Sequence, residues 1–199
     1  MKITSEIVKE LRQRTGIGIM ECKKALKESK GDINQAIIIL RKRGYDRAKK
    51  KTARETSEGA VGAYIHLNGK IGVLVEINCE TDFVARNNEF QELIKNIAMH
   101  IAAANPKYIS PEDIPSNELE EEKEITRDQF KNSGKPPEII EKIVEGKLKK
   151  FYQEVCLLEQ PYIKDQNISI RQLVASFISK FGENIRIRRF TRYQLGESL

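Results

Sequence analysis

Apolar residues recur at helical spacing through the first part of the chain. Thr4 or Ser5 can cap a first helix, which the glycines of RTGIG (residues 14–18) end. A second helix ends at Gly31, and Asp32 caps a third that is expected to end before Gly44. The apolar stripes comprise Ile7, Val8 and Leu11, then Met20, Ala25 and Leu26, then the isoleucines of INQAIIILRKR. The pattern predicts a small three-helix bundle.

The clearest strand pattern lies in residues 60–79. The segments AVGAYIHL and KIGVLVEINC alternate apolar with polar residues on either side of Asn68-Gly69. A type I′ turn needs positive φ at both central residues, which Asn and Gly tolerate. The sequence therefore predicts a β-hairpin.

Helices predominate in the rest of the chain. Helical spacing predicts helices over 88–104, over 137–158 and over 169–181, whereas the acidic, proline-containing segment 107–124 is expected to be a loop that enters a helix. Residues 184–195 alternate well enough for a third strand. The expected fold class is α+β: an N-terminal helical bundle followed by a core of helices packed on a small antiparallel sheet.

A charged segment, YDRAKKKTARETSE (residues 45–58), separates these two parts. Its composition suits either a linker or a solvated helix bridging two domains. We therefore expect a helical domain with the start of the linker over 1–54, and an α+β core domain over 55–199. Residues 1–54 hold 16 Lys and Arg against 6 Asp and Glu, and the remainder holds 19 against 23. A basic front half suits nucleic acid or an acidic protein partner, or else consists of ordinary solvated helix faces.

Composition points away from an enzyme. His66 and His100 lie far apart and have no metal-ligand spacing with any cysteine, and neither a phosphate-binding loop nor a G-x-S-x-G motif occurs. We expect no catalytic residues, no metal and no cofactor.

The cysteines and the apolar runs bear on location. Cys22, Cys79 and Cys156 are odd in number and far apart, which indicates reduced, mostly buried thiols in a cytoplasm. No apolar run has the length of a membrane span, and the start of the chain lacks the apolar region of a secretion signal. We expect a cytoplasmic protein without a membrane partner.

The segment NCETDFVARN (residues 78–87) places Asp82 and Phe83 where a strand is expected to end. Phe83 lies seven residues before Phe90, so one continuous helix would put both rings in the core. Asn87-Asn88, however, is a typical cap for a new helix, and Phe83 would then be available to enter something else. Asp82 suits the first turn of a helix through the helix dipole, which is compatible with a functional role.

Three segments together resemble the bacterial elongation factor Ts family in its short form. ELRQRTGIGIMECKKALKESKGDINQAI (residues 10–37) and NCETDFVARN are similar to the two signatures of that family, and KFGENIRIRRF (residues 180–190) is similar to its C-terminal core motif. They occur in the right order and span nearly the whole chain. The resemblance implies a translation elongation factor that exchanges guanine nucleotide on elongation factor Tu without covalent chemistry. It also implies a ubiquitin-associated-like N-terminal bundle and, because short members resemble half-sized cores that pair, a homodimer with the core as dimerisation domain.

The resemblance also implies roles for individual residues. Arg12, Ile19 and Met20 match positions that approach the nucleotide-binding domain of the partner, although many members carry Met where Ile19 stands. The residues that match the segment which displaces magnesium from the partner are Thr81, Asp82, Phe83 and Val84.

Two other classes remain open on the residues alone. A basic RNA-binding module is supported by the N-terminal charge and by four arginines of the last expected strand, but that strand lacks the alternating aromatics of a stacking surface. These arginines are Arg186, Arg188, Arg189 and Arg192. A ubiquitin-associated-type adaptor would leave the long core unexplained. With the family resemblance, no direct binding of nucleic acid is expected.

Overall fold

The fold is α+β, as predicted. The computed structural model describes residues 3–131 and 133–197. Its contacts divide the chain into two compact units, each assembled from separate segments. The first unit comprises residues 1–62, 76–94 and 172–188, and the second comprises 63–75, 95–171 and 189–199. The predicted boundary between residues 54 and 55 stays a prediction.

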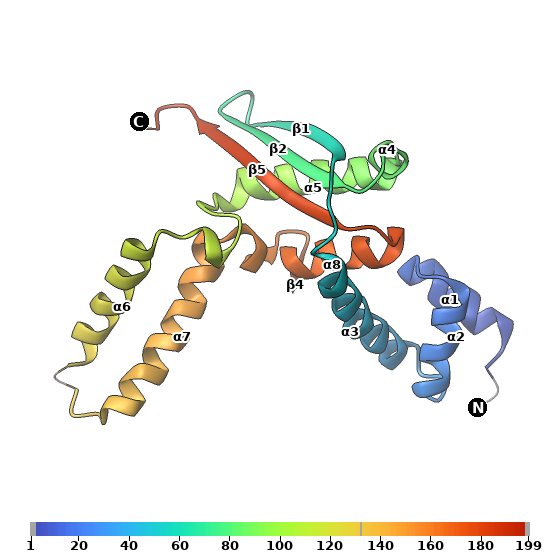
Figure 1. The fold of residues 1–199 in the computed structure, drawn as a ribbon, viewed down its shortest axis with the longest axis horizontal. Helices are drawn as coiled ribbons and strands as arrows, with labels where there is room; N and C mark the ends of the chain where they lie inside the picture. Colours follow the sequence, from blue (N-terminus) through green and yellow to red (C-terminus); the bar gives the residue numbers. More distant parts are fainter. Residues whose placement is uncertain (1–2, 132, 198–199) are drawn as a thin grey trace. The chain divides into compact units, whose positions relative to one another are not determined.

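Three helices open the first unit: α1 (Ser5–Thr15), α2 (Ile19–Glu28) and α3 (Ile33–Lys51) (Figure 1). Thr4 and Asp32 cap α1 and α3 as predicted: their side chains accept hydrogen bonds from the amides of Ile7 (3.5 Å) and Gln35 (3.0 Å). The helices enclose one apolar cluster, made of Val8, Leu11, Cys22, Ala25, Leu26, Ala36 and Leu40. The likeness of this bundle to a ubiquitin-associated domain stays a prediction.

The predicted end of the third helix before Gly44 is wrong, since α3 continues to Lys51. Gly44 is buried, and a Cβ built there would lie 3.4 Å from the side chain of Ser179 in α8 (Ile170–Phe181). Gly44 thus lies where α3 packs against α8, and this packing outweighs the low helix propensity of glycine. The segment after Lys51 is irregular, so the charged segment is part helix and part linker.

A three-stranded sheet has the order β1–β2–β5, with β1 at Glu58–His66, β2 at Ile71–Cys79 and β5 at Ile185–Gln194. All three strands were predicted. Asn68 and Gly69 have φ of 54° and 90°, and the amide of Lys70 donates to the carbonyl of Leu67 at 3.2 Å, as a type I′ turn requires. Leu67 also has positive φ, at 50°, which the turn prediction did not include.

The core side of the sheet is marked by the alternation of β2, whose buried residues are Val73, Val75, Ile77 and Cys79. Helix α5 (Asn88–Ala104) begins and ends where the sequence predicted. Its buried stripe comprises Phe90, Leu93, Ile94, Ile97, Ala98, Ile101 and Ala102. In the second unit, the Arg192 guanidinium of β5 donates from Nε to the carbonyl of Ala102 at 3.3 Å and joins strand to helix.

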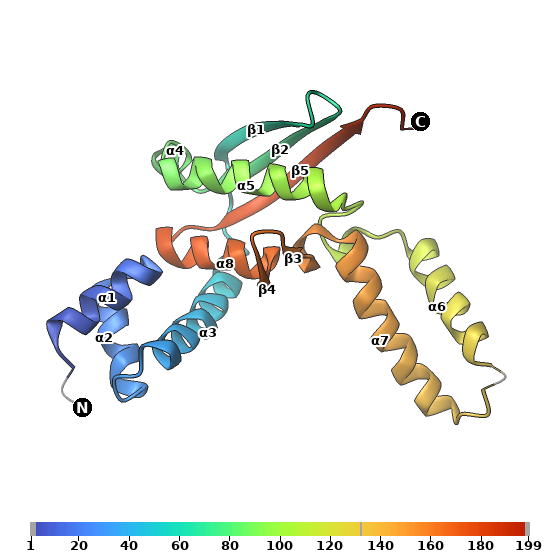
Figure 2. The same cartoon turned by 180° about the vertical axis from the view of Figure 1, so that it is seen from behind.

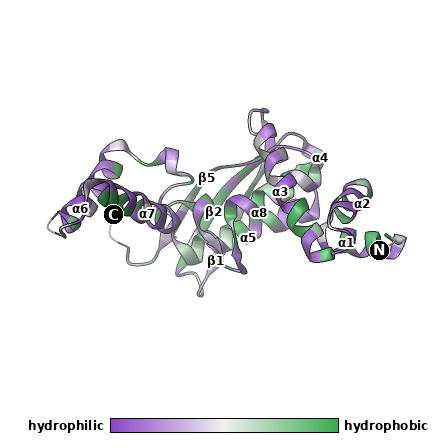
Figure 3. Cartoon of the chain, turned by 90° about the horizontal axis from the view of Figure 1, so that it is seen from below, coloured by the Kyte–Doolittle hydropathy of each residue, from purple (hydrophilic) through white to green (hydrophobic). Residues whose placement is uncertain are grey.

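The second unit carries a helical hairpin that follows a short 3₁₀ turn, η1 (Pro111–Asp113). Helices α6 (Ser116–Phe130) and α7 (Pro137–Val155) lie side by side (Figure 2) and are largely hydrophilic (Figure 3). Arg127 joins them, because it binds Glu120 at 3.2 Å on its own helix and Glu141 at 2.9 Å on the other. The expected loop before α6 is present.

Helix α7 ends at Val155, three residues before the predicted end. Cys156 is extended instead, and the next amide, that of Leu157, donates to the carbonyl of Tyr108 at 2.8 Å. The chain then forms η2 (Leu157–Glu159) and a small hairpin of β3 (Pro161–Tyr162) and β4 (Asp165–Ser169), which the sequence patterns did not predict. Over the described residues, every helix is too short or too polar to cross a membrane.

Candidate functional site

The segment TDFVA forms a capped turn of helix, α4 (Asp82–Ala85), directly after β2. Thr81 is extended, and its hydroxyl accepts a hydrogen bond from the amide of Val84 at 3.4 Å, which is a typical helix N-cap. Val84 and Ala85 are buried, whereas Thr81, Asp82 and Phe83 are exposed. One side of this short element, with Val84 and Ala85, is therefore packed in the core, and the other side, with Asp82 and Phe83, is exposed to solvent.

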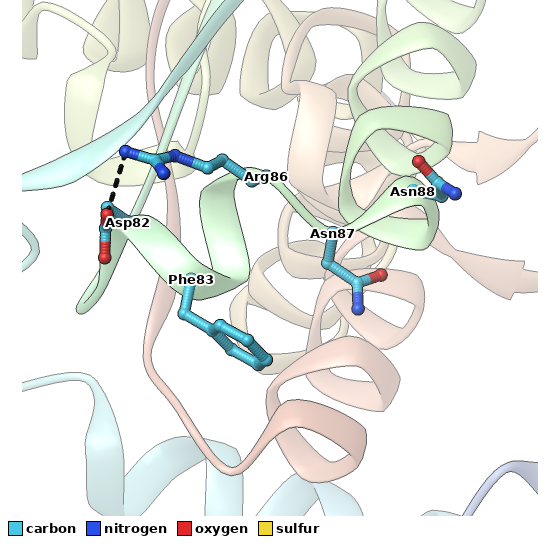
Figure 4. A pocket seen from close by; sticks show the side chains of 5 residues that line it. All are labelled: Asp82, Phe83, Arg86, Asn87 and Asn88. Atoms are coloured by element: carbon cyan, nitrogen blue, oxygen red, sulfur yellow. Dashed lines mark ion pairs between the residues drawn. The ribbon is translucent and has the colours of Figure 1, made fainter.

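Phe83 is 79% exposed, so the interpretation of Phe83 as a core residue is wrong. The helix does not continue from Phe83 to Phe90, because Asn87 interrupts it: its side chain accepts the amide of Glu89 at 2.8 Å and caps α5. In Figure 4 the Phe83 ring points away from α4 rather than toward the helix that follows. Large aromatic side chains are mostly buried on average, so this exposure makes Phe83 a candidate for contact with another molecule.

Asp82 lies beside Phe83 but is directed to another side of α4. Its carboxylate pairs with Arg86 at 3.0 Å, one helical turn later (Figure 4). Both side chains of this pair are largely exposed, so the pair contributes little to stability and can be broken at low cost. An open hollow of about 430 Å³ is lined by Asp82, Phe83, Arg86, Asn87 and Asn88.

Two residues hold the end of β2 next to the start of β5. Glu80 accepts hydrogen bonds from the amide of Asn184 (2.6 Å) and from the Arg54 guanidinium (3.4 Å). The side-chain amide of Asn184 in turn donates to the carbonyl of Arg54 at 2.8 Å. Sequence reasoning gave no role to Asn184. The signal was present, since Asn184 belongs to the KFGENIRIRRF motif.

The other predicted contact residues lie on the three-helix bundle. Arg12 is in the last turn of α1, and Ile19 and Met20 open α2; all three are exposed. Among the described residues, no hydrogen bond or ion pair links these three to Thr81, Asp82, Phe83 or Val84. The first unit therefore presents two sets of exposed residues that are not directly bonded to each other: Arg12, Ile19 and Met20 on the bundle, and Thr81, Asp82 and Phe83 at α4.

The turn between α1 and α2 lies against the end of α8. A Cβ built on Gly16, whose φ is 67°, would come within 2.7 Å of the Lys180 side chain. Lys180 also pairs with Glu89 in the first turn of α5. Gly16 thus leaves room for the side chain that joins the bundle to the helix next to α4.

The residues of the site offer a ring and a charge rather than a set of metal ligands. In the part of the chain that the structure describes, no three His, Cys, Asp or Glu side chains gather in a group that could hold a metal ion. An exposed aromatic ring beside a loosely paired carboxylate suits insertion into another macromolecule. The fold and the site thus define an α+β protein that presents an exposed aromatic ring and a loosely paired carboxylate on an ordered turn.

Comparison with known proteins identifies the family. The family model "Elongation factor TS" matches residues 45–197. Elongation factor Ts of Koribacter versatilis is 59% identical over 197 residues, which are 99% of this chain and 90% of the relative. The protein of that name from Thermodesulfovibrio yellowstonii is 58% identical over 100% of this chain and 98% of the relative, and that from Fervidobacterium nodosum is 56% identical over 99% and 100%. The chain belongs to the elongation factor Ts family of translation elongation factors.

Proposed function

We propose that the protein is a guanine-nucleotide exchange factor that binds elongation factor Tu in its GDP form, displaces magnesium and promotes GDP release. The observation that carries the proposal is the exposure of Phe83 on a capped turn beside Asp82. The family supports the choice of partner. The factor makes and breaks no covalent bond, needs no cofactor, and works in the cytoplasm, where translation takes place.

The site acts on the partner in two ways. Phe83 enters an apolar pocket of elongation factor Tu as a wedge, with Thr81 and Val84 fixing the turn that carries it. Asp82 presents a negative charge whose present partner, Arg86, is exposed and easily exchanged. Together they disturb the magnesium ion and the phosphate-binding loop that hold GDP.

One residue cannot supply the whole effect. A roughly ten-thousandfold acceleration of release needs about 5.5 kcal/mol of barrier lowering, whereas burial of a Phe side chain gives about 1.5–3 kcal/mol. The remainder comes from preferential binding of the nucleotide-free partner, since equal binding of both states shifts nothing. Arg12, Ile19 and Met20 provide a second contact, with Ile19 49% and Met20 66% exposed.

The domains divide this work. Residues 1–54 form the helical domain that binds the nucleotide-binding domain of the partner, and residues 55–199 form the core that carries the wedge. Because the factor binds the partner at two places, it can favour the arrangement of the partner's parts that has lost its nucleotide. Linkage requires that GDP weaken binding of the factor by the same ratio by which the factor weakens binding of GDP.

The test is release of fluorescent GDP from elongation factor Tu, with and without the full chain, at several magnesium concentrations. Acceleration that saturates with the factor, together with a complex that added GDP dissociates, is expected. Unchanged release at micromolar factor would contradict the proposal. RNA binding that falls steeply with salt, without any effect on release, would favour the RNA-binding alternative instead.

We further propose that the protein forms a homodimer through its sheet. Leu74 is 51% exposed on the outer face of β2, and Ile65 lies on the same face, because its Cδ1 is 3.4 Å from where a Cβ on Gly72 would be. Large exposed apolar residues on the strands of the second unit and directly after them support this interface. They are Ile65, Leu67, Leu74, Tyr193 and Leu195.

Sedimentation velocity tests the dimer. Leu74→Lys is expected to shift a dimeric protein toward the monomer, because it places charges in an apolar interface that a two-fold axis repeats. Ile125→Lys is the matched control, since Ile125 is similarly exposed on α6. A wild-type protein that stays monomeric at high concentration would rule out the interface.

A further inference from the structure

We propose that Glu183 is a positioning residue for nucleotide exchange: it fixes the direction of α4, and so of Phe83, through two hydrogen bonds to Thr81. The inference rests on the proposed function and assigns a role to a residue of the KFGENIRIRRF motif. Glu183 lies 102 positions from Thr81 in the chain and two residues before the start of β5. It reaches Thr81, the residue that caps α4, rather than Asp82 or Phe83 themselves.

The two hydrogen bonds use both oxygens of the carboxylate. Glu183 Oε2 accepts the backbone amide of Thr81 at 3.0 Å, and Oε1 accepts the Thr81 hydroxyl at 2.7 Å. A carboxylate that receives two donors from one residue fixes both its distance and its orientation. The same hydroxyl oxygen caps α4 by accepting the amide of Val84. Glu183 therefore fixes the position of Thr81, and Thr81 as N-cap fixes the start of α4.

The carbonyl of Thr81 is fixed as well. It accepts the thiol of Cys79 at 3.2 Å and the amide of Ala85 at 3.2 Å. Burial, together with the negative charge of Glu183, raises the pKa of Cys79 to about 11, so the thiol keeps the hydrogen that it donates. The amide, the hydroxyl and the carbonyl of Thr81 all have partners within the first unit.

Helix α4 depends on these contacts because it is only four residues long. A helix this short is not stable by itself and takes its direction from its ends. The later end is held by burial of Val84 and Ala85, and the earlier end is held at Thr81. Without Glu183, the amide and the hydroxyl of Thr81 turn to water, and Asp82 and Phe83 sample more directions. A wedge then reaches the productive position less often, although the factor still binds its partner through the bundle.

The experiment compares Glu183→Ala with Glu183→Gln in GDP release from elongation factor Tu at saturating factor. Glu183→Ala is expected to lower the maximal release rate about tenfold, the factor that about 1.4 kcal/mol gives. The factor concentration at half-maximal rate should change little, because Arg12, Ile19 and Met20 are untouched. Glu183→Gln should recover most of the rate. Its amide oxygen can still accept the Thr81 amide, and its NH₂ can donate to the hydroxyl oxygen.

Two further variants separate positioning from simple loss of stability. In a Phe83→Ala background, Glu183→Ala should add much less than its own tenfold effect, because residues that act as a unit are not additive. Glu118→Ala is the matched control: Glu118 is also a half-buried carboxylate that accepts a hydroxyl, that of Tyr108, at 2.5 Å. It should leave the maximal rate unchanged.

Hydrogen exchange of the free protein measures how firmly the start of α4 is held in the absence of the partner. The amides of Val84 and Ala85 should exchange faster in Glu183→Ala and at the wild-type rate in Glu183→Gln. Wild-type exchange of these amides in Glu183→Ala, a wild-type maximal release rate in that variant, or a Gln variant as slow as the Ala variant would each overturn the inference. An inactive wild-type protein would overturn the proposed function as well, whereas an active wild type with a normal Glu183→Ala variant overturns the positioning role alone.

Discussion

Phe83 and Phe90 lie seven residues apart, yet Phe83 is 79% exposed and Phe90 is completely buried. In one continuous helix the two rings would share a face. The cap at Asn87 ends that continuity, so α5 begins anew and α4 points its aromatic ring outward. Two phenylalanines of one short segment thus have opposite environments: the Phe83 ring is exposed to solvent and the Phe90 ring is in the core.

This difference predicts opposite results for the two alanine variants. Phe83→Ala should leave the melting temperature nearly unchanged while GDP release slows at least tens-fold, since its ring contributes about 1.5–3 kcal/mol when it is buried in the partner. Phe90→Ala should lower the free energy of unfolding by about 3–5 kcal/mol. Calorimetry and the release assay on the same preparations decide. A Phe83→Ala protein that is destabilised like Phe90→Ala, with full activity per folded molecule, would contradict the wedge.

Asp82→Ala should act through magnesium. The variant should release GDP slowly in magnesium buffer, and its defect should shrink when EDTA removes the metal, because the step that Asp82 promotes is then already complete. Its stability should change little, since the lost pair with Arg86 is exposed. Arg86→Ala is the control for loss of that pair alone. An equal defect with and without EDTA would show that Asp82 acts by another route.

Local signals in the sequence predicted most of the secondary structure. The hairpin followed from Asn68-Gly69, and α5 followed from an uninterrupted apolar stripe that begins behind Asn87. Such patterns involve only a few neighbouring residues, so the elements that they specify can be predicted without knowledge of the rest of the fold. The exposure of Phe83 depends on the same cap at Asn87. The sequence alone did not decide it, because Phe83 also fits the apolar stripe that contains Phe90.

Contacts between distant segments were not predictable in this way. The local sequence at Gly44 predicts a helix end, whereas in the structure Gly44 packs against Ser179 and α3 continues to Lys51. Glu183 and Thr81 are separated by 102 positions, and no local pattern pairs them. Strands as short as Pro161–Tyr162 carry too few residues for an alternating pattern. In each case, tertiary packing decides what propensity leaves undetermined.

The thiols give a simpler test. Burial raises the pKa of Cys22 and raises those of Cys79 and Cys156 to about 11, so all three stay protonated and shielded near neutral pH. The native protein should react slowly with a thiol reagent. After unfolding without reductant, three thiols per chain should react, since no intramolecular disulfide is expected. A smaller number would reveal a bridge, whether within one chain or between two.

His100 connects three segments of the second unit inside the protein. Its Nδ1 accepts the amide of Ile163 at 3.3 Å, so Nε2 carries the hydrogen and donates to the Gln160 side-chain oxygen at 3.0 Å. The amide nitrogen of Gln160 donates to the carbonyl of Glu154 at 2.8 Å. Burial lowers the pKa of His100, an effect that the hydrogen bond with Gln160 partly offsets. A proton on Nδ1 would face the amide of Ile163 and break that hydrogen bond.

Stability should therefore fall as the pH drops below the ordinary histidine pKa of 6.5. In that range the unfolded chain binds a proton at His100 and the folded chain does not, so each pH unit costs up to about 1.4 kcal/mol until the lowered folded pKa is reached. Denaturant unfolding at pH 7.5, 6.5 and 5.5 measures the slope. His100→Phe should be less stable at pH 7.5 by about 1–3 kcal/mol, because Gln160 and Ile163 lose their partner. Its deficit should shrink toward pH 5.5, because the titrating group is gone. A deficit that stays constant over this range would show that His100 does not titrate differently in the folded and unfolded states.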